Sequence, residues 1–254
     1  MKLKKNLSLI AFLCISFIAN AQQKLSSPDG NLEMTFTLDG QGTPTYELTY
    51  KQKEVIKPSR LGLELKKEDA NAKTDFEWTD KKDIDKLDIK TNLYNGFELK
   101  DVQTSTNDET WQPVWGEEKE IRNHYNEMAV CLSDEADTKL TLRFRVFDDG
   151  VGFRYEYEVA GVDSIFVTDE LTSFNMAQDG ISWSIPANYE TYELLYRTQP
   201  LSKTDNANTP MTFKVGKTYA SIHEAALTDF PEMTLQNTGG CGFKSELAPW
   251  PDGI

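Results

Sequence analysis

Two adjacent aspartates are the first residues that could do chemistry. Hydrolysis of a glycosidic bond uses two carboxyl groups held about 5 to 10 Å apart across a sugar. Asp148 and Asp149 are consecutive, precede Gly150 and lie between two runs of alternating apolar residues. Asp-Gly between such runs is typical of a hairpin turn. We therefore expect exposed turn carboxylates here rather than an acid and a base, with Arg145 and Arg154 pairing with acidic surface neighbours.

The polar stretch Arg122–Glu127 is a second candidate, because it presents His124, Asn126 and Glu127 close together. The residues alone leave two interpretations open. One is a polar site that displays these three side chains. The other, which we favour, is a hydrogen-bonded network that joins a loop to the body of the domain.

A third candidate is the pair Glu190 and Glu193, which stands among tyrosines just after the predicted strand Ile181–Ile185. Carboxylates in such a loop can bind Ca²⁺, a hard cation that prefers oxygen ligands. The residues alone favour a solvated pair. Trp111 and Trp115 could line a sugar surface, but two tryptophans more often anchor a core, and we expect the latter.

Several other kinds of site are disfavoured. The cluster Gly239–Gly242 lacks the glycine spacing and following helix of a phosphate-binding loop, so a surface loop is expected. The acidic run Asp83–Asp88 has an aspartate where a calcium loop of the EF-hand type needs glycine. Cys131 and Cys241 allow either one disulfide or two free thiols, and we favour free thiols.

The N-terminus has the pattern of a secretory signal peptide over residues 1–21, with three lysines before the apolar run Leu7–Ile18. No later stretch approaches the roughly 20 apolar residues of a membrane helix, so we expect an exported chain without membrane insertion. Removal of the signal leaves 24 basic and 41 acidic residues, a formal charge of −17. Such a surface repels phosphate backbones, so no nucleic-acid partner is expected.

Short alternating runs such as Leu32–Leu38 and Leu140–Val146 recur along the chain and predict half-buried strands. Turn formers separate them, including Asp39-Gly40, Asn95-Gly96 and Asp179-Gly180. The pattern predicts one large all-β domain over residues 22–254, a sandwich or a barrel. The positive φ of tight turns is assigned to the glycines of these pairs.

Three stretches depart from this pattern. The charge-rich residues 66–86 read as an excursion with a short strand at 75–79. Residues 202–210 read as a long loop. The last residues, from 248 to 254, end in turn chemistry without a closing strand, so we expect the chain to be cut short.

Five motifs in this order make the chain resemble the N-terminal domain of glycoside hydrolase family 97. These motifs are Ser27–Leu32, Lys57–Leu63, Trp115–Glu117 with Arg122–Glu127, Phe144–Tyr155 and His223–Phe230. The similarity covers essentially the whole chain after the signal peptide. It implies a large antiparallel β-supersandwich of the galactose-mutarotase type. In complete members a catalytic (β/α)8 barrel and a small β domain follow.

The resemblance also implies a function. Residues 1–21 and the stretch Leu61–Asp69 are similar to the periplasmic α-glucosidases of starch utilisation in this family. The implied protein is a calcium-dependent, exo-acting α-glucosidase that takes α-linked, starch-derived oligosaccharides in the periplasm. The catalytic residues of the family belong to the barrel, so this chain holds none and is expected to be inactive alone. The domain forms a wall of the active site and provides one Ca²⁺ ligand, which aligns with Glu193; Glu190 is the weaker alternative.

Two rival interpretations remain. One is a free-standing carbohydrate-binding or mutarotase-like β-sandwich that shares the domain, since fold alone does not fix function. A mutarotase carries its own acid and base, typically including histidines, whereas this chain offers only His124 and His223, in unrelated settings. The other rival is an α-galactosidase of the same family, because the barrel residues decide between the two sugars.

Overall fold

The structure is a computed structural model that describes residues 21–65, 92–159, 165, 167–228 and 231–248. Strands dominate this part of the chain, and every strand pairing in it is antiparallel. Its one helix is the three-residue 3-10 helix η1, Leu201–Lys203. The charge-rich stretch 66–86 and residues 249–254 lie outside the described residues. Within these residues, no helix has the length and apolar character to span a membrane.

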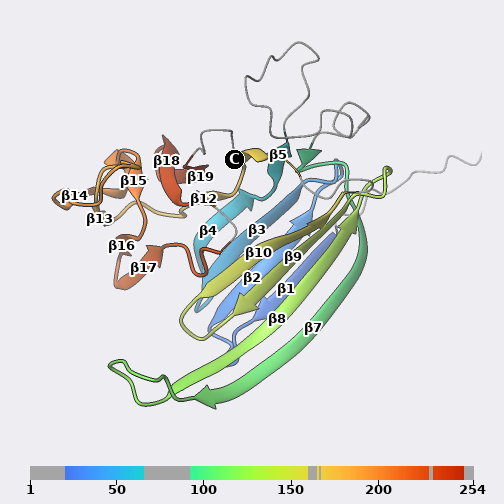
Figure 1. Cartoon of the computed structure of the whole chain (residues 1–254), viewed down its shortest axis with the longest axis horizontal. Coiled ribbons are helices and arrows are strands. Elements are labelled where there is room, and N and C mark those ends of the chain that lie inside the picture. The colour runs from blue at the N-terminus through green and yellow to red at the C-terminus, as the bar shows by residue number, and fades with distance from the viewer. Residues whose placement is uncertain (1–20, 66–91, 160–164, 166, 229–230, 249–254) are drawn as a thin grey trace, which may run out of the picture.

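Two four-stranded sheets pack face to face and form the body of the molecule (Figure 1). The first has the order β1-β2-β3-β4 and the second the order β10-β9-β8-β7. Their bounds are Ala21–Ser26 (β1), Leu32–Leu38 (β2), Pro44–Tyr50 (β3), Lys53–Arg60 (β4), Glu98–Trp111 (β7), Ile121–Ser133 (β8), Lys139–Val146 (β9) and Val151–Glu158 (β10). The predicted all-β sandwich is therefore confirmed.

The core lies between these two sheets. Side chains of a strand alternate between its faces, so every second residue of β9 is buried, including Leu140, Leu142 and Phe144. Phe36 of β2 faces Phe144 with their ring centroids 6.2 Å apart, and neither residue is exposed. Complete burial of such a side chain contributes about 1.5–3 kcal/mol, so this layer holds the sandwich together.

Three smaller sheets extend the body; in Figure 1 the sheet that contains β5 lies at the top and the other two lie to the left. Their strand orders are β11-β5-β6, β12-β19-β18-β15 and β14-β13-β16-β17. The bounds are Leu63–Leu65 (β5), Asn92–Leu93 (β6), Val167–Glu170 (β11), Ser173–Asn175 (β12), Ile181–Ser184 (β13), Arg197–Pro200 (β14), Ala207–Asn208 (β15), Met211–Val215 (β16), Thr218–Ile222 (β17), Met233–Gly239 (β18) and Gly242–Leu247 (β19).

The prediction that the glycines of the turn pairs have a positive φ is confirmed only in part. Gly96 has the expected positive φ of 70°, but Gly40 and Gly180 are not among the positive-φ glycines. At Gly180 a Cβ atom would collide with the carbonyl oxygen of Lys214, so close approach to β16 is what requires glycine there. The predicted loop 202–210 is interrupted, because it contains the end of η1 and the short strand β15.

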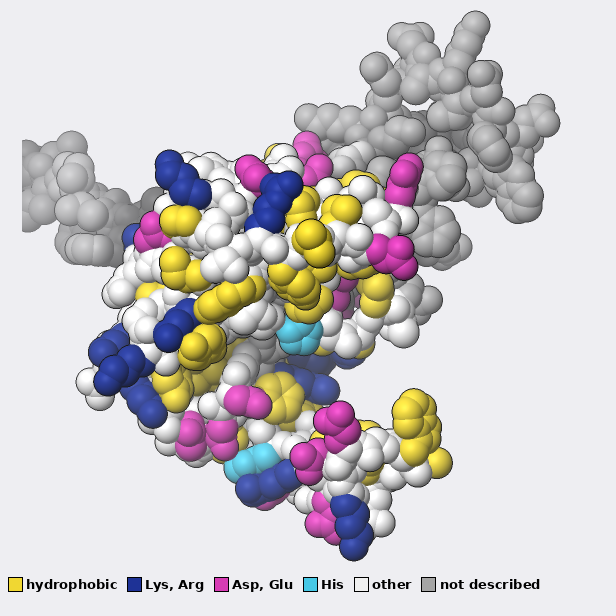
Figure 2. Space-filling model, turned by 90° about the vertical axis from the view of Figure 1, so that its left-hand side faces the viewer, with side chains coloured by type: hydrophobic (Ala, Val, Ile, Leu, Met, Phe, Trp, Pro, Cys, Tyr) yellow, Lys and Arg dark blue, Asp and Glu magenta, His cyan; other side chains and the backbone are white. Residues whose placement is uncertain are grey.

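Strands β7 and β8 continue beyond the rest of their sheet. The pairing of β8 with β9 ends at Asn126, whereas its pairing with β7 runs on to Ile121 opposite Trp111. Residues 107–125 thus form a two-stranded projection, called the arm below, which curves away at the bottom of Figure 1. In Figure 2 the face of the molecule is hollowed between the arm below and the smaller sheets above.

Candidate functional site

The paired aspartates occupy the turn between β9 and β10, as predicted. The turn is closed by a hydrogen bond of 2.8 Å from the amide of Phe147 to the carbonyl of Gly150. One carboxylate oxygen of Asp148 accepts a hydrogen bond of 2.8 Å from the amide of Asp29, in the turn between β1 and β2. Asp148 therefore joins the turns of two facing sheets, which is a structural role.

The arginines beside this turn pair with glutamates, again as predicted. Arg145 contacts Glu127 at 2.7 Å, and Arg154 contacts Glu156 at 2.6 Å. Between them Arg143 donates to Glu127 at 2.8 Å and to Glu156 at 2.7 Å, so the network crosses β8, β9 and β10. Hydrogen bonds from Arg143, reinforced by Arg154, lower the pKa of Glu156 to about 2.

The three polar residues of the second candidate lie in strand β8 rather than in a loop, and they do not form one site. Glu127 points to the arginine network, whereas the side-chain amide of Asn126 donates 2.8 Å to the carbonyl of Ser26 in β1. The Nδ1 atom of His124 is buried and has no hydrogen-bond partner among the described residues. The favoured interpretation, a hydrogen-bonded network, is confirmed for Asn126 and Glu127. The network joins strands, however, and does not hold a loop.

Glu190 and Glu193 lie in the connection between β13 and β14, residues 185–196, and both are exposed. The connection follows a strand, as expected, but has almost no regular structure. Its amides are satisfied locally: that of Glu190 bonds Asn188 Oδ1 at 2.8 Å, and that of Glu193 bonds Thr191 Oγ1 at 3.0 Å. Neither carboxylate has a hydrogen bond or ion pair within the described part of the chain.

Two tyrosines of the same connection reach strand β18 and the residue before it. The hydroxyl of Tyr192 donates a short hydrogen bond to the carboxylate of Glu232. The hydroxyl of Tyr189 lies 3.4 Å from Oγ1 of Thr234. Partial burial, together with the Glu232 carboxylate, raises the pKa of the Tyr192 phenol, so it stays protonated and donates. Sequence reasoning missed Glu232, because 40 residues separate it from Tyr192 and no local pattern links them.

The tryptophans are exposed, so the expectation that they anchor the core is wrong. Trp111 ends β7 with 49% of its surface accessible, and Trp115 in the turn of the arm is 88% accessible. Val114 beside it is 99% accessible. An arm of two strands has no inner layer, which leaves these side chains uncovered in this chain. Cys131 and Cys241 are free thiols, as favoured.

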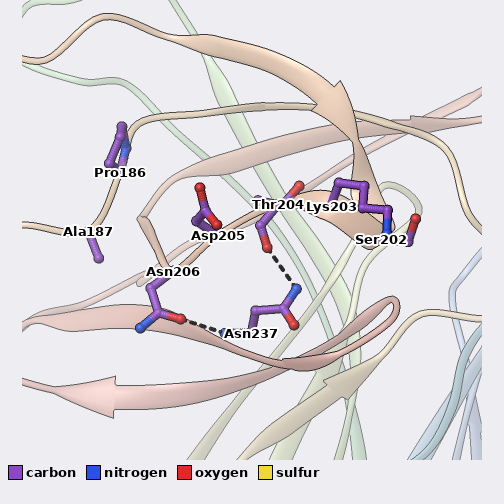
Figure 3. Close-up of a pocket in the computed structure, with 8 residues that line it drawn as sticks. All are labelled: Pro186, Ala187, Ser202, Lys203, Thr204, Asp205, Asn206 and Asn237. Carbon is purple, nitrogen blue, oxygen red and sulfur yellow. Dashed lines mark hydrogen bonds between the residues drawn. The ribbon is translucent and has the colours of Figure 1, made fainter.

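A shallow polar depression lies near the base of the Glu193 connection (Figure 3). Asn237 crosses its floor, donating from its side chain to the carbonyl of Thr204 at 2.7 Å and from its amide to Asn206 Oδ1 at 3.0 Å. Asp205 at its rim faces Arg197 at 3.2 Å. These hydrogen bonds join the segment after η1 to β18, which gives the depression a structural role.

A calcium ion fits Glu193 only as one ligand of a larger site. The carboxylate is exposed, unpaired and of the oxygen type that Ca²⁺ prefers. However, no group of three His, Cys, Asp or Glu side chains in the described residues could hold a metal. Ca²⁺ takes six to eight oxygens, so Glu193 would be one ligand among several.

Comparisons with known proteins place the chain among glycoside hydrolases. Residues 25–250 match the family described as Glycosyl-hydrolase 97 N-terminal. A retaining alpha-galactosidase from Bacteroides thetaiotaomicron is 25% identical over 261 residues, which cover 96% of this chain and 35% of that protein.

Solved structures of known proteins lead to the same family. A glycoside hydrolase family 97 enzyme from Pseudoalteromonas sp. strain K8, solved with panose and with acarbose, has a TM-score of 0.77 and 33% identity. The alignment covers 91% of this chain and 33% of that enzyme. A beta-arabinopyranosidase with a TM-score of 0.72 and 19% identity, aligned over 88% of this chain and 35% of its own, shares the fold. The chain spans about a third of the length of these relatives.

Proposed function

Because the chain belongs to glycoside hydrolase family 97, as its N-terminal domain, we propose that it forms one wall of the active site of a calcium-dependent α-glycoside hydrolase. The observation that carries this proposal is Glu193, an exposed and unpaired carboxylate on the connection between β13 and β14. The longer protein acts in the periplasm after removal of residues 1–21, and its catalytic barrel supplies the acid, the second carboxylate and the remaining calcium ligands.

Glu193 contributes binding and orientation rather than proton transfer. Calcium, when bound, supplies positive charge that polarises groups at the sugar site. The carboxylate of Glu193 offers two oxygens to the ion, and its own connection orients it through the Asn188 and Thr191 turns. We assign protonation of the leaving oxygen to the barrel, which in this proposal supplies both carboxyl groups of the reaction.

Exposed apolar side chains support contact with a large partner. Leu195 is 90% accessible and Tyr196 61%, both close in sequence to Glu193. Val114 and Trp115, in the turn of the arm, are similarly uncovered. Large uncovered apolar side chains are candidates for an interaction surface, and we assign these two pairs to contact with the catalytic barrel.

The proposed substrates are starch-derived oligosaccharides with α-linked glucose at the end that is cleaved. Support comes from the family 97 enzyme solved with panose, an α-linked glucose oligosaccharide, since it is 33% identical to this chain. An α-galactosidase is the second candidate, favoured by the 25% identical retaining alpha-galactosidase.

The test is hydrolysis of aryl α-glucoside and aryl α-galactoside by the full-length protein and by the 254-residue chain. We expect the full-length protein to prefer the glucoside by about 10-fold or more in kcat/KM. Chelation should abolish activity, Ca²⁺ should restore it, and the shorter chain should be inactive. Preference for the galactoside would select the second candidate. Turnover by the shorter chain alone would overturn the proposal.

A further inference from the structure

The connection that carries Glu193 is anchored firmly only at its base. Pro186 forms an isolated β-bridge with Ala207, and the amide of Asn188 donates 2.9 Å to Asn208 Oδ1. The far end enters β14 at Arg197. Between these points the backbone lacks strand pairing, so side chains must fix its position.

Tyr192 provides the only hydrogen bond from residues 190–196 to another element within the described residues. Its hydroxyl donates to the carboxylate of Glu232. Tyr189 reaches Thr234, so both tyrosines contact the N-terminal end of β18 or the residue before it. Two tyrosines three residues apart therefore brace the connection against one strand.

The acceptor side is rigid. The carbonyl of Glu232 accepts 2.8 Å from the amide of Ala248, and the next residue, Met233, opens the β18–β19 ladder opposite Leu247. The amide of Met233 also donates 2.7 Å to the carboxylate of Glu224. The hydrogen bond from Tyr192 to Glu232 therefore attaches the exposed connection to a residue that the β18–β19 sheet holds in place.

We propose that Tyr192 is a positioning residue for Glu193: the hydrogen bond to Glu232 fixes the connection so that the adjacent carboxylate is held ready for the cation. The inference rests on the proposed function. Ligand carboxylates need such supporting contacts, whose loss typically weakens metal binding about 10- to 100-fold. Tyr192 lies next to Glu193 on an unpaired backbone, so freeing its ring frees the ligand.

The competing role for Glu232 is that of a direct ligand, and two substitutions separate the roles. Glu232→Gln keeps an oxygen that accepts the tyrosine hydrogen bond but removes the charge. Glu232→Ala removes both. If Glu232 only anchors Tyr192, the glutamine variant binds Ca²⁺ like the wild type and the alanine variant resembles Tyr192→Phe.

Calcium affinity, measured by isothermal titration calorimetry on the full-length protein, is the first arm of the experiment. We expect Tyr192→Phe to weaken binding about 10-fold. Tyr157→Phe, a control on β10 at a tyrosine that is similarly exposed, should leave it unchanged. An unchanged affinity for Tyr192→Phe, while Glu193→Gln loses binding, overturns the inference alone. A large loss in Glu232→Gln also overturns it, in favour of direct ligation.

Hydrogen exchange of the 254-residue chain, without calcium, is the second arm. Tyr192→Phe should accelerate exchange in residues 190–196 and leave the β18–β19 ladder protected. Equal exchange in variant and wild type contradicts the anchoring role. If Glu193→Gln leaves calcium affinity intact, the proposed function fails and the positioning role toward calcium falls with it, whatever the exchange data report about the anchor.

Discussion

Glu170 is a buried carboxyl group, with 7% of its surface accessible. Its Oε1 accepts 2.6 Å from the hydroxyl of Thr172, which lies 2.6 Å from the hydroxyl of Tyr155. Burial raises the pKa of Glu170, and the nearby carboxylates of Glu224 and Asp169 raise it further. The native state therefore binds the Glu170 proton more tightly than the unfolded state.

Glu170→Gln should remove a pH dependence of stability. In the wild type the free energy of unfolding falls as pH rises from the ordinary glutamate pKa, 4.5, toward the higher folded pKa. The variant should melt higher than wild type at pH 8, by about 2–4 °C for each kcal/mol gained, and should lose this advantage below pH 4.5. Thermal unfolding at several pH values measures it. Parallel stability curves for variant and wild type would contradict the assignment.

The role of a residue could be predicted from the sequence where residues next to it in the chain determine that role. The Asp148-Asp149-Gly150 turn followed from local chemistry, and the structure confirms it. The bond from Tyr192 to Glu232 depends on two segments that meet only in the folded state, so no spacing in the sequence could predict it.

At the scale of elements, strands buried on one face were the predictable ones. β9 alternates between buried and more exposed positions, β2 does so except at the buried Thr35, and both runs were predicted correctly from the sequence. No strand was predicted from the sequence over β7. It is an edge strand, exposed along most of its length, so its residues lack an alternating pattern. The Trp111 and Trp115 prediction failed for the same reason, since the arm has no layer that would cover them.

The arginine network should stabilise the sheet β10-β9-β8 in a pH-dependent way. Because the pKa of Glu156 is lowered to about 2 in the native state, its contribution is present above pH 4.5 and is lost as pH falls toward 2. We expect Glu156→Gln to cost about 1–2 kcal/mol at pH 7, allowing for solvent screening, in urea unfolding. Glu158→Gln, which breaks an exposed pair with Lys139, is the control and should have no measurable effect. Equal effects of both variants, or a loss that persists at pH 2, would contradict this role.

The whole molecule is a sandwich with a hollowed face that ends in an uncovered arm. A two-stranded ribbon is marginally stable in water, and Trp115 at its tip is 88% accessible. If the barrel covers this face, acrylamide should quench Trp115 fluorescence strongly in the 254-residue chain and weakly in the full-length protein. Subtracting the fluorescence of Trp115→Phe from that of the wild type isolates the contribution of Trp115. Equal quenching in both proteins would place the arm away from the barrel.

The calcium affinity of the full-length protein carrying Glu193→Gln tests the central claim most directly, with Glu190→Gln as the matched control. Both residues are exposed on the same connection, and in the described part of the chain neither carboxylate has a hydrogen bond or ion pair. If Glu193 is the ligand that this domain provides, Glu193→Gln should weaken Ca²⁺ binding by more than about 10-fold, while Glu190→Gln should bind like the wild type. Wild-type affinity in Glu193→Gln would contradict the account.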